Sequence, residues 1–184
     1  MAVHSSQVPL GTPLPEQLLP DLDGATHFLP GVRGTGVLVV AFTCNHCPYV
    51  RHIETALGEL AATYTDASDV KFVTICSNDV AAYPDDDVDG LREQAARAGW
   101  AFPYLIDRDQ VVAKLFGAAC TPDFFVYDIN GNLGYRGAFD GSTPGNDVAV
   151  TGSDLRNAIE LLRATKPVPE PQRPSMGCSI KWRD

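Results

Sequence analysis

Short apolar runs alternate with amphipathic segments along the first half of the chain. Residues 36–43 (GVLVVAFT) and 70–76 (VKFVTIC) are rich in β-branched residues. Nearly continuous apolar runs of this length are typical of strands covered on both faces. Residues 50–64 place apolar side chains three or four positions apart, which predicts an amphipathic helix. A second helix is predicted over residues 88–98, ending at Gly99. Strands that alternate with helices predict a mostly parallel, layered sheet.

The pattern changes in the second half of the chain. YLID at residues 104–107 predicts a short strand, followed by a helix with Asp109 at its N-cap and Gly117 just past its end. The segment DFFVYDINGNLGYRG contains two strand-like runs around Asn130-Gly131, a two-residue hairpin signal. A final helix is predicted to bury Leu155, Ala158, Ile159 and Leu162.

The chain is predicted to form one domain over residues 1–166, because a single core commonly serves a chain of this length. Residues 167–184 contain four prolines before the ending GCSIKWRD. They predict an extended tail that packs on the same domain and lacks regular structure until its end. The acidic run DDDVD at residues 85–89 is interpreted as a solvated entry to the helix at residues 88–98.

Composition and charge narrow the class of protein. Hydrophobic residues make up 45% of the chain and charged residues 20%, which is ordinary for a globular fold. The net charge of -9 removes a general attraction to phosphate backbones, so we expect no nucleic-acid partner. The N-terminal residues lack the basic start and apolar stretch of a signal peptide, and no run approaches the roughly 20 apolar residues of a membrane span. We therefore expect a cytoplasmic protein without membrane contact.

The candidate chemistry lies in FTCNHCPYV, where Cys44 and Cys47 follow the first predicted strand. A disulfide needs Cα atoms about 4.4–6.8 Å apart, and positions i and i+3 of a first helical turn meet that requirement. Unpaired backbone N–H groups and the helix dipole favour a thiolate there. A protonated His46 would add a cation beside Cys44 and lower its pKa further. Pro48 is tolerated because first-turn N–H groups have no partner within the helix.

Two other uses of the same cysteines stay open. Cys44 and Cys47, with His46 or Cys178, could bind zinc or copper(I), although a closed zinc site usually needs a second ligand pair at matching spacing and none follows. The cysteines could also be small buried side chains without redox activity.

The order strand, TCNHCP, helix and then CTPDFFVYDINGNLGYRG resembles the thioredoxin fold. That resemblance implies an α/β fold with a central mixed sheet flanked by helices on both faces. It also implies that Thr121-Pro122 is a cis peptide facing the dithiol, with the Thr121 backbone free to orient a substrate. The motifs CNHCPYV, CSND, YPDDD, FPYLIDRDQ, GAACTPDFF and GCSIKW are similar to those of the peroxiredoxin-like branch, the alkyl hydroperoxide reductase and thiol-specific antioxidant (redoxin) group.

The chain departs from the peroxidase motif of that group. Peroxidatic cysteines there resemble Pro-x-x-x-Thr-x-x-Cys, with a distant arginine. Aligning Cys47 with that cysteine puts Val40 at the proline position and Cys44 at the threonine position. Arg136 is the candidate arginine, although we prefer to interpret it as a surface residue on a strand.

Three further cysteines are assigned in turn. Cys120 precedes the Thr121-Pro122 pair, so it is either a further redox thiol or a core residue at a strand entry. Cys76 ends a buried strand and is interpreted as packing. Cys178 lies on a tail that can reach about 36 Å from Pro167, far enough to meet the active site, so it is either a third redox thiol or part of a tail that only covers the sheet.

The leading hypothesis is a thiol-disulfide oxidoreductase. Cys44 attacks a substrate disulfide, Cys47 resolves the mixed disulfide, His46 tunes Cys44, and Thr121 and Pro122 orient the substrate. No organic cofactor is needed; the expected partners are a disulfide or peroxide substrate and an external thiol or thioredoxin-type reductant. The alternatives are a thiol peroxidase and a metal-binding module.

Overall fold

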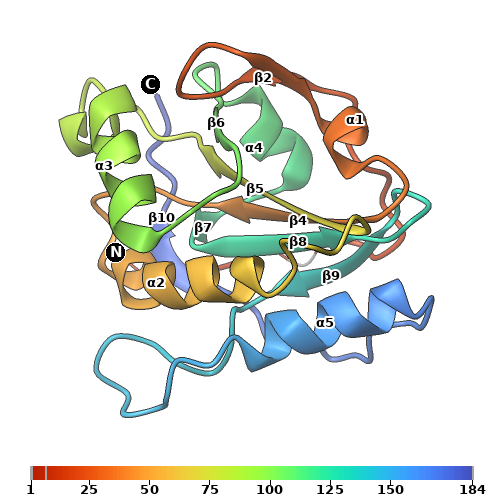
Figure 1. Ribbon diagram of the computed structural model, residues 1–184. Coiled ribbons are helices and arrows are strands. Elements are labelled where there is room, and N and C mark those ends of the chain that lie inside the picture. The colour runs from red at the N-terminus through yellow and green to blue at the C-terminus, as the bar shows by residue number, and fades with distance from the viewer. Residues whose placement is uncertain (1, 7, 184) are drawn as a thin grey trace.

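A five-stranded mixed sheet forms the centre of the protein, which is described by a computed structural model over residues 2–6 and 8–183 (Figure 1). The strand order is β6-β5-β4-β8-β9. β4 pairs in parallel with β5, and β5 with β6, whereas β8 and β9 are antiparallel. This confirms the predicted α/β class with a mixed sheet. The strands are β4 (Val37–Phe42), β5 (Val70–Cys76), β6 (Tyr104–Ile106), β8 (Asp123–Tyr127) and β9 (Leu133–Gly137).

Helices cover both faces of this sheet because β4 is apolar on both sides. Val37, Val39 and Ala41 join one core, and the alternate residues of the same strand join the other. Figure 1 shows α2 and α5 on one side of the sheet and α1 and α4 on the other. None of the described helices is both long and apolar enough to cross a membrane. The helices are α1 (Leu29–Arg33), α2 (Pro48–Ala62), α3 (Val88–Ala98), α4 (Val111–Phe116) and α5 (Ser153–Arg163), with a 3₁₀ turn at Pro84–Asp86.

The predicted helix ends are correct at Gly99 and Gly117, both of which are left-handed C-caps. The predicted N-cap of α4 at Asp109 is wrong, since that position is occupied by Gln110 with a φ of 61°. The physical reason is that the buried carboxylate of Asp107 accepts the N–H groups of the first turn, from Val112 at 3.2 Å and Ala113 at 2.9 Å.

The predicted hairpin joins β8 to β9, but its connection is longer than two residues. The Gly131 N–H donates to the Asp128 carbonyl at 2.9 Å, and Gly131 has a φ of 80°. Asp128 Oδ1 also accepts the N–H groups of Asn130 and Asn132. Glycine thus takes the left-handed position that closes a longer turn.

Five short strands were not predicted, because segments of two to four residues give no measurable periodicity. β2 (Leu18–Pro20) pairs with β3 (Thr26–Phe28). β1 (Ala2–His4), β10 (Met176–Ser179) and β7 (Cys120–Thr121) form a second sheet with β10 in the middle. The tail is irregular from Ala164 until β10, as predicted. β10 therefore brings Cys178 opposite Thr121, beside the dithiol segment.

Candidate active site

The dithiol lies where β4 runs into α2, at the carboxyl end of the parallel strands. Cys44 and Cys47 are both 0% exposed. Cys47 is the N-cap of α2 and Pro48 its first residue, so Cys44 precedes the helix. The prediction that both cysteines occupy the first helical turn is therefore wrong for Cys44. Only Cys47 lies where the helix dipole favours a thiolate.

Thr121 contacts both sulfur atoms from the neighbouring strand entry. Its hydroxyl lies 3.3 Å from Cys44 Sγ, and its carbonyl oxygen lies 3.1 Å from Cys47 Sγ. The Thr121-Pro122 peptide is cis, as the resemblance implied. The backbone of Thr121 is not free, however, because β10 pairs with it.

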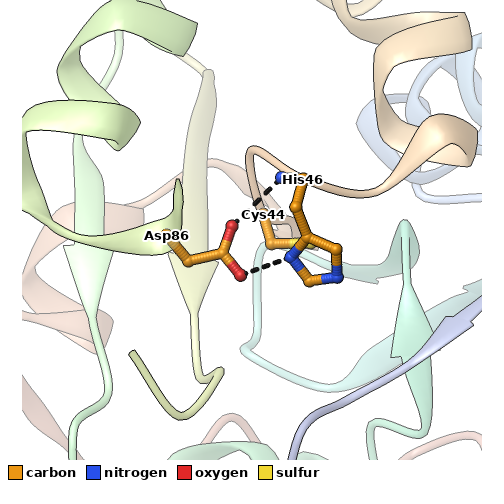
Figure 2. Close-up of side chains that lie close together, drawn as sticks. All are labelled: Cys44, His46 and Asp86. Atoms are coloured by element: carbon orange, nitrogen blue, oxygen red, sulfur yellow. Dashed lines mark hydrogen bonds and ion pairs between the residues drawn. The ribbon is translucent and has the colours of Figure 1, made fainter. Parts of the chain in front are cut away.

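His46 forms an ion pair with Asp86 on the other side of Cys44 (Figure 2). His46 Nδ1 lies 2.6 Å from Asp86 Oδ2, and the imidazole stacks on the ring of Tyr83 at 4.8 Å between centroids. The side-chain ligand atoms of Cys44, His46 and Asp86 all lie within 4.8 Å of one another. Sequence reasoning thus placed His46 correctly near Cys44 but missed the carboxylate that holds it.

Asp86 corrects the interpretation of DDDVD as a solvated run. Its side chain is 0% exposed and accepts four hydrogen bonds, from the backbone N–H groups of Asn45 and His46 and from the His46 and Asn78 side chains. Burial opposes ionisation, but these donors outweigh it and lower the pKa of the carboxyl. Of its neighbours, Asp87 caps α3 by accepting the Gly90 N–H at 2.8 Å. Asp86 therefore fixes the loop between the two cysteines.

A further polar layer holds the same loop from α3. Gln94 Nε2 donates to the Cys44 carbonyl at 3.0 Å. Arg97 bridges Asn45 Oδ1 and the buried carboxylate of Glu54, at 2.9 and 2.7 Å. Pattern analysis gave no signal for these residues, because their partners lie about 40 to 50 positions away along the chain.

The two thiols differ in acidity. Burial, the hydrogen bond to Cys47 and the charge of Asp86 raise the pKa of the Cys44 thiol well above its usual value. A hydrogen bond from Cys44 outweighs burial and lowers the pKa of the Cys47 thiol to about 5, with further stabilisation from Cys178. The prediction of a lowered pKa at Cys44 is therefore wrong, because burial and the charge of Asp86 disfavour a thiolate there.

The profile of the AhpC/TSA family matches residues 10–136. The chain belongs to this family. Solved structures with closely similar folds include an uncharacterized conserved protein from Geobacillus kaustophilus (43% identity, TM-score 0.95, covering 100% of this chain and 97% of that one). A hypothetical protein from Sinorhizobium meliloti 1021 is also similar (42% identity, TM-score 0.94, covering 98% of both chains). No curated protein matches the sequence.

More distant members of the fold share its architecture. A secreted Mycobacterium tuberculosis disulfide oxidoreductase, homologous to E. coli DsbE, is 20% identical with a TM-score of 0.62, covering 80% of this chain and 96% of that chain. At this identity the similarity supports the thioredoxin-like fold alone. Membership of the AhpC/TSA family supports oxidoreductase chemistry in general terms.

Arg136 does not resemble the peroxide-binding arginine of this AhpC/TSA family. It is 7% exposed, which corrects the prediction of a surface residue. It pairs with Phe125, whose ring belongs to the core on the opposite face from the dithiol, so the guanidinium is directed away from Cys47. Its contacts are with Gln172 of the tail, at 3.2 Å from the guanidinium and 3.0 Å from the backbone N–H.

The other cysteines separate into two kinds. Cys76 and Cys120 are buried, and burial raises the pKa of each thiol, to about 12 for Cys76 and further for Cys120. Cys178 is partly exposed and packs against the core that contains Cys47. Burial raises the pKa of Cys178 to about 11, and its hydrogen bond to Cys47 acts in the same direction.

Cys44, His46 and Asp86 lie within 4.8 Å of one another, but His46 and Asp86 are set at hydrogen-bonding distance. Two ligands of a tetrahedral zinc ion at about 2.0–2.1 Å from the metal are about 3.3 Å apart. The 2.6 Å between His46 Nδ1 and Asp86 Oδ2 is a hydrogen-bond distance instead, and Asn78 donates to the same oxygen. Coordination by Cys44, His46 and Asp86 would have to break this network.

Proposed function

We propose that this AhpC/TSA family member is a thiol-disulfide oxidoreductase whose redox centre is the Cys44–Cys47 dithiol. The observation that carries the proposal is that two sulfurs meet where β4 runs into α2 and that Thr121 contacts both, at 3.3 Å from Cys44 Sγ and 3.1 Å from Cys47 Sγ. The surroundings lower the pKa of the Cys47 thiol and raise that of the Cys44 thiol. A thiolate is the nucleophile of disulfide exchange, and a neighbouring thiol completes it.

In the proposed reaction Cys47, not Cys44, makes the first attack. Its thiolate attacks one sulfur of a substrate disulfide, the substrate S–S bond breaks, and a mixed disulfide forms on Cys47. Cys44 then attacks Cys47 Sγ, its proton passes to the departing substrate thiolate, and the Cys44–Cys47 disulfide forms. The substrate has gained two electrons, and an external thiol or thioredoxin-type reductant restores the dithiol. No organic cofactor takes part.

The surroundings support a peptide substrate with apolar side chains. A cavity of about 320 Å³ lies beside Pro122, and Tyr49, Ile53, Phe139 and Met176 contribute apolar walls to it. Asp86 and His46 keep the loop rigid, and Thr121 contacts both sulfurs. We place this activity in the cytoplasm, without nucleic-acid or membrane partners.

A thiol peroxidase is the second candidate, favoured by the acidity of Cys47 at the position that aligns with a peroxidatic cysteine. Its thiolate would attack a peroxide oxygen, so that an S–O bond forms, the O–O bond breaks and an alcohol or water leaves; Cys44 would then condense with the Cys47 sulfenic acid to a disulfide with loss of water, and an external thiol would reduce it. Cys44 at the threonine position and the direction of Arg136 both weaken this alternative.

The test is reduction of insulin by the purified protein with dithiothreitol as electron donor, and the reaction is monitored through the turbidity of the precipitating insulin chains. We expect activity in the wild type, a loss of at least about 100-fold in Cys47→Ser and Cys44→Ser, and normal activity in Cys76→Ala, which removes a buried thiol outside the proposed pair. Rapid hydroperoxide consumption that depends on Cys47, with no insulin reduction, would favour the peroxidase instead. Inactivity of the wild type in both assays, where a thioredoxin control works, would refute the dithiol proposal.

A further inference from the structure

The C-terminal strand β10 lies directly against the proposed active site. Its register pairs Cys178 with Thr121 and Ser179 with Cys120. Its approach is close, because a Cβ added at Gly177 would lie 2.0 Å from the Thr121 carbonyl oxygen. Only glycine allows the tail backbone to come this near to the Thr121-Pro122 peptide.

The side chain of Cys178 shares a face with the dithiol. Residues directly opposite in an antiparallel pair project to the same side, and the Thr121 side chain contacts Cys44 Sγ at 3.3 Å. Cys178 packs against the buried cluster that contains Cys47, and each of the two thiols shifts the pKa of the other. Three sulfurs therefore form one cluster, with Cys47 between Cys44 and Cys178.

Exposure differs sharply within this cluster. Cys44 and Cys47 are 0% exposed, whereas Cys178 is partly exposed. A disulfide between Cys44 and Cys47 would have both sulfurs buried beside β10, so a reductant as large as a protein would reach it more slowly. A disulfide between Cys47 and Cys178 would have one sulfur at the surface.

We propose that Cys178 is a third redox-active thiol, which takes over the disulfide from the Cys44–Cys47 pair and presents it to an external thiol reductant. This inference rests on the proposed function, and it identifies Cys178 as the sulfur that the external reductant attacks.

The transfer needs no additional oxidant or reductant. Cys178 loses its proton and attacks Cys47 Sγ; the Cys44–Cys47 bond breaks, the Cys47–Cys178 bond forms, and Cys44 leaves as a thiolate that takes up a proton. The external thiol then attacks Cys178 Sγ and expels Cys47, which is the best leaving group of the three because a lower pKa favours departure. A second thiol of the reductant releases Cys178, so two electrons enter in total.

The first experiment maps disulfides in the full-length protein after oxidation with one equivalent of diamide, alkylation at low pH and peptide mass spectrometry. Wild type is expected to contain both the Cys44–Cys47 and Cys47–Cys178 linkages, and Cys44→Ser only the latter. A double variant, Cys178→Ser with Ser179→Cys, is the matched control. It keeps one tail thiol but turns it to the other face of the strand, so no linkage to Cys47 is expected.

The second experiment measures how fast the oxidised protein is reduced. Oxidised Cys178→Ser is expected to be reduced by a thioredoxin-type protein at least tenfold more slowly than oxidised wild type. When the reductant is a small phosphine, the difference between the two rates should be much smaller. Circular dichroism checks that each variant is folded.

The inference is overturned if folded wild type and Cys44→Ser yield no Cys47–Cys178 linkage, or if Cys178→Ser is reduced by the protein reductant at the wild-type rate. Insulin reduction that survives either result would leave the dithiol proposal standing. Absence of the Cys44–Cys47 linkage together with absence of insulin reduction would refute both.

Discussion

Cys44 and Cys47 are three residues apart, yet their surroundings move the two thiol pKa values in opposite directions. Cys47 lies at a helix N-terminus, where neighbouring groups lower the pKa of its thiol, whereas Cys44 is buried beside the carboxylate of Asp86. Each thiol also acts on the other, because the hydrogen bond that stabilises a thiolate at Cys47 keeps the proton on Cys44.

Replacing Cys44 separates the effect of this hydrogen bond from the effect of the helix. Cys44→Ala removes the donor, and we expect it to raise the pKa of the Cys47 thiol by about one unit or more, since a hydrogen bond to a charged group contributes about 1.5–3 kcal/mol. Cys44→Ser keeps a donor and should raise it less. Thiolate absorbance measured against pH distinguishes the two variants. An equal pKa in both would show that a hydrogen-bond donor at position 44 does not stabilise the thiolate.

Whether a site residue could be predicted from the sequence depends on how far along the chain its partners lie. The dithiol, His46 and Thr121-Pro122 could be predicted, because a local motif or a family resemblance marks them. Asp86 could not, since its role depends on the loop after β5 folding back onto the loop after β4. Carboxyl ends of neighbouring parallel strands meet at one edge, so the position of the loop was predictable although the choice among the neighbouring aspartates was not.

At the scale of elements, the hydrophobic periodicity predicted long helices and strands better than short ones. The bounds of β4, β5, α2 and α3 were predicted within one or two residues, and the buried residues of α5 were predicted correctly, because each element has several apolar positions in register. β1, β7 and β10 have two to four residues, and they are stabilised by pairing with distant segments instead of by their own pattern. Sequence alone therefore describes the elements that carry the dithiol well, but not the short strands β7 and β10 that pack beside it.

Docking of β10 depends on Gly177. A valine there would place its Cβ against the Thr121 carbonyl, so Gly177→Val should displace the strand, lower the free energy of unfolding by about 1–3 kcal/mol and expose Cys178. The measurements are urea unfolding and the rate of alkylation at Cys178, expected to increase at least tenfold. Met176→Val, at an exposed position of the same strand, is the control and should change neither. An unchanged alkylation rate in Gly177→Val would contradict the docking described above.

At the scale of the whole molecule, the site links ionisation to stability. The pKa of Cys47 is about 5 in the folded protein, below the 9.0 of an unperturbed thiol, so the thiolate stabilises the reduced fold fully above about pH 9 and progressively less as the pH falls towards 5. Asp123 has the opposite effect, because burial raises its pKa to about 7 and its stabilisation is lost as the pH rises to that value.

Comparison of wild type with Cys47→Ser isolates the contribution of the thiolate, because both proteins retain Asp123. We expect the difference in free energy of unfolding between the reduced proteins to grow with pH between about 5 and 9, with a slope of up to about 1.4 kcal/mol per pH unit. Denaturant unfolding at several pH values measures it, and the oxidised wild type serves as a control without the thiolate. A difference that stays constant over this range would mean that Cys47 is protonated in the fold.

The N-terminal strand β1 lies at this site, since β1 pairs with β10 and β10 pairs with β7, whereas the chain after β10 runs on to Arg183, whose N–H donates to Gln110. Figure 1 shows the N-terminal end beside β10 and α2. An affinity tag fused to the N-terminus would consequently begin close to the sulfur cluster, and a tag rich in histidine would bring foreign metal ligands to it. Recombinant protein for redox work should therefore carry a removable tag, and its activity should be compared before and after cleavage.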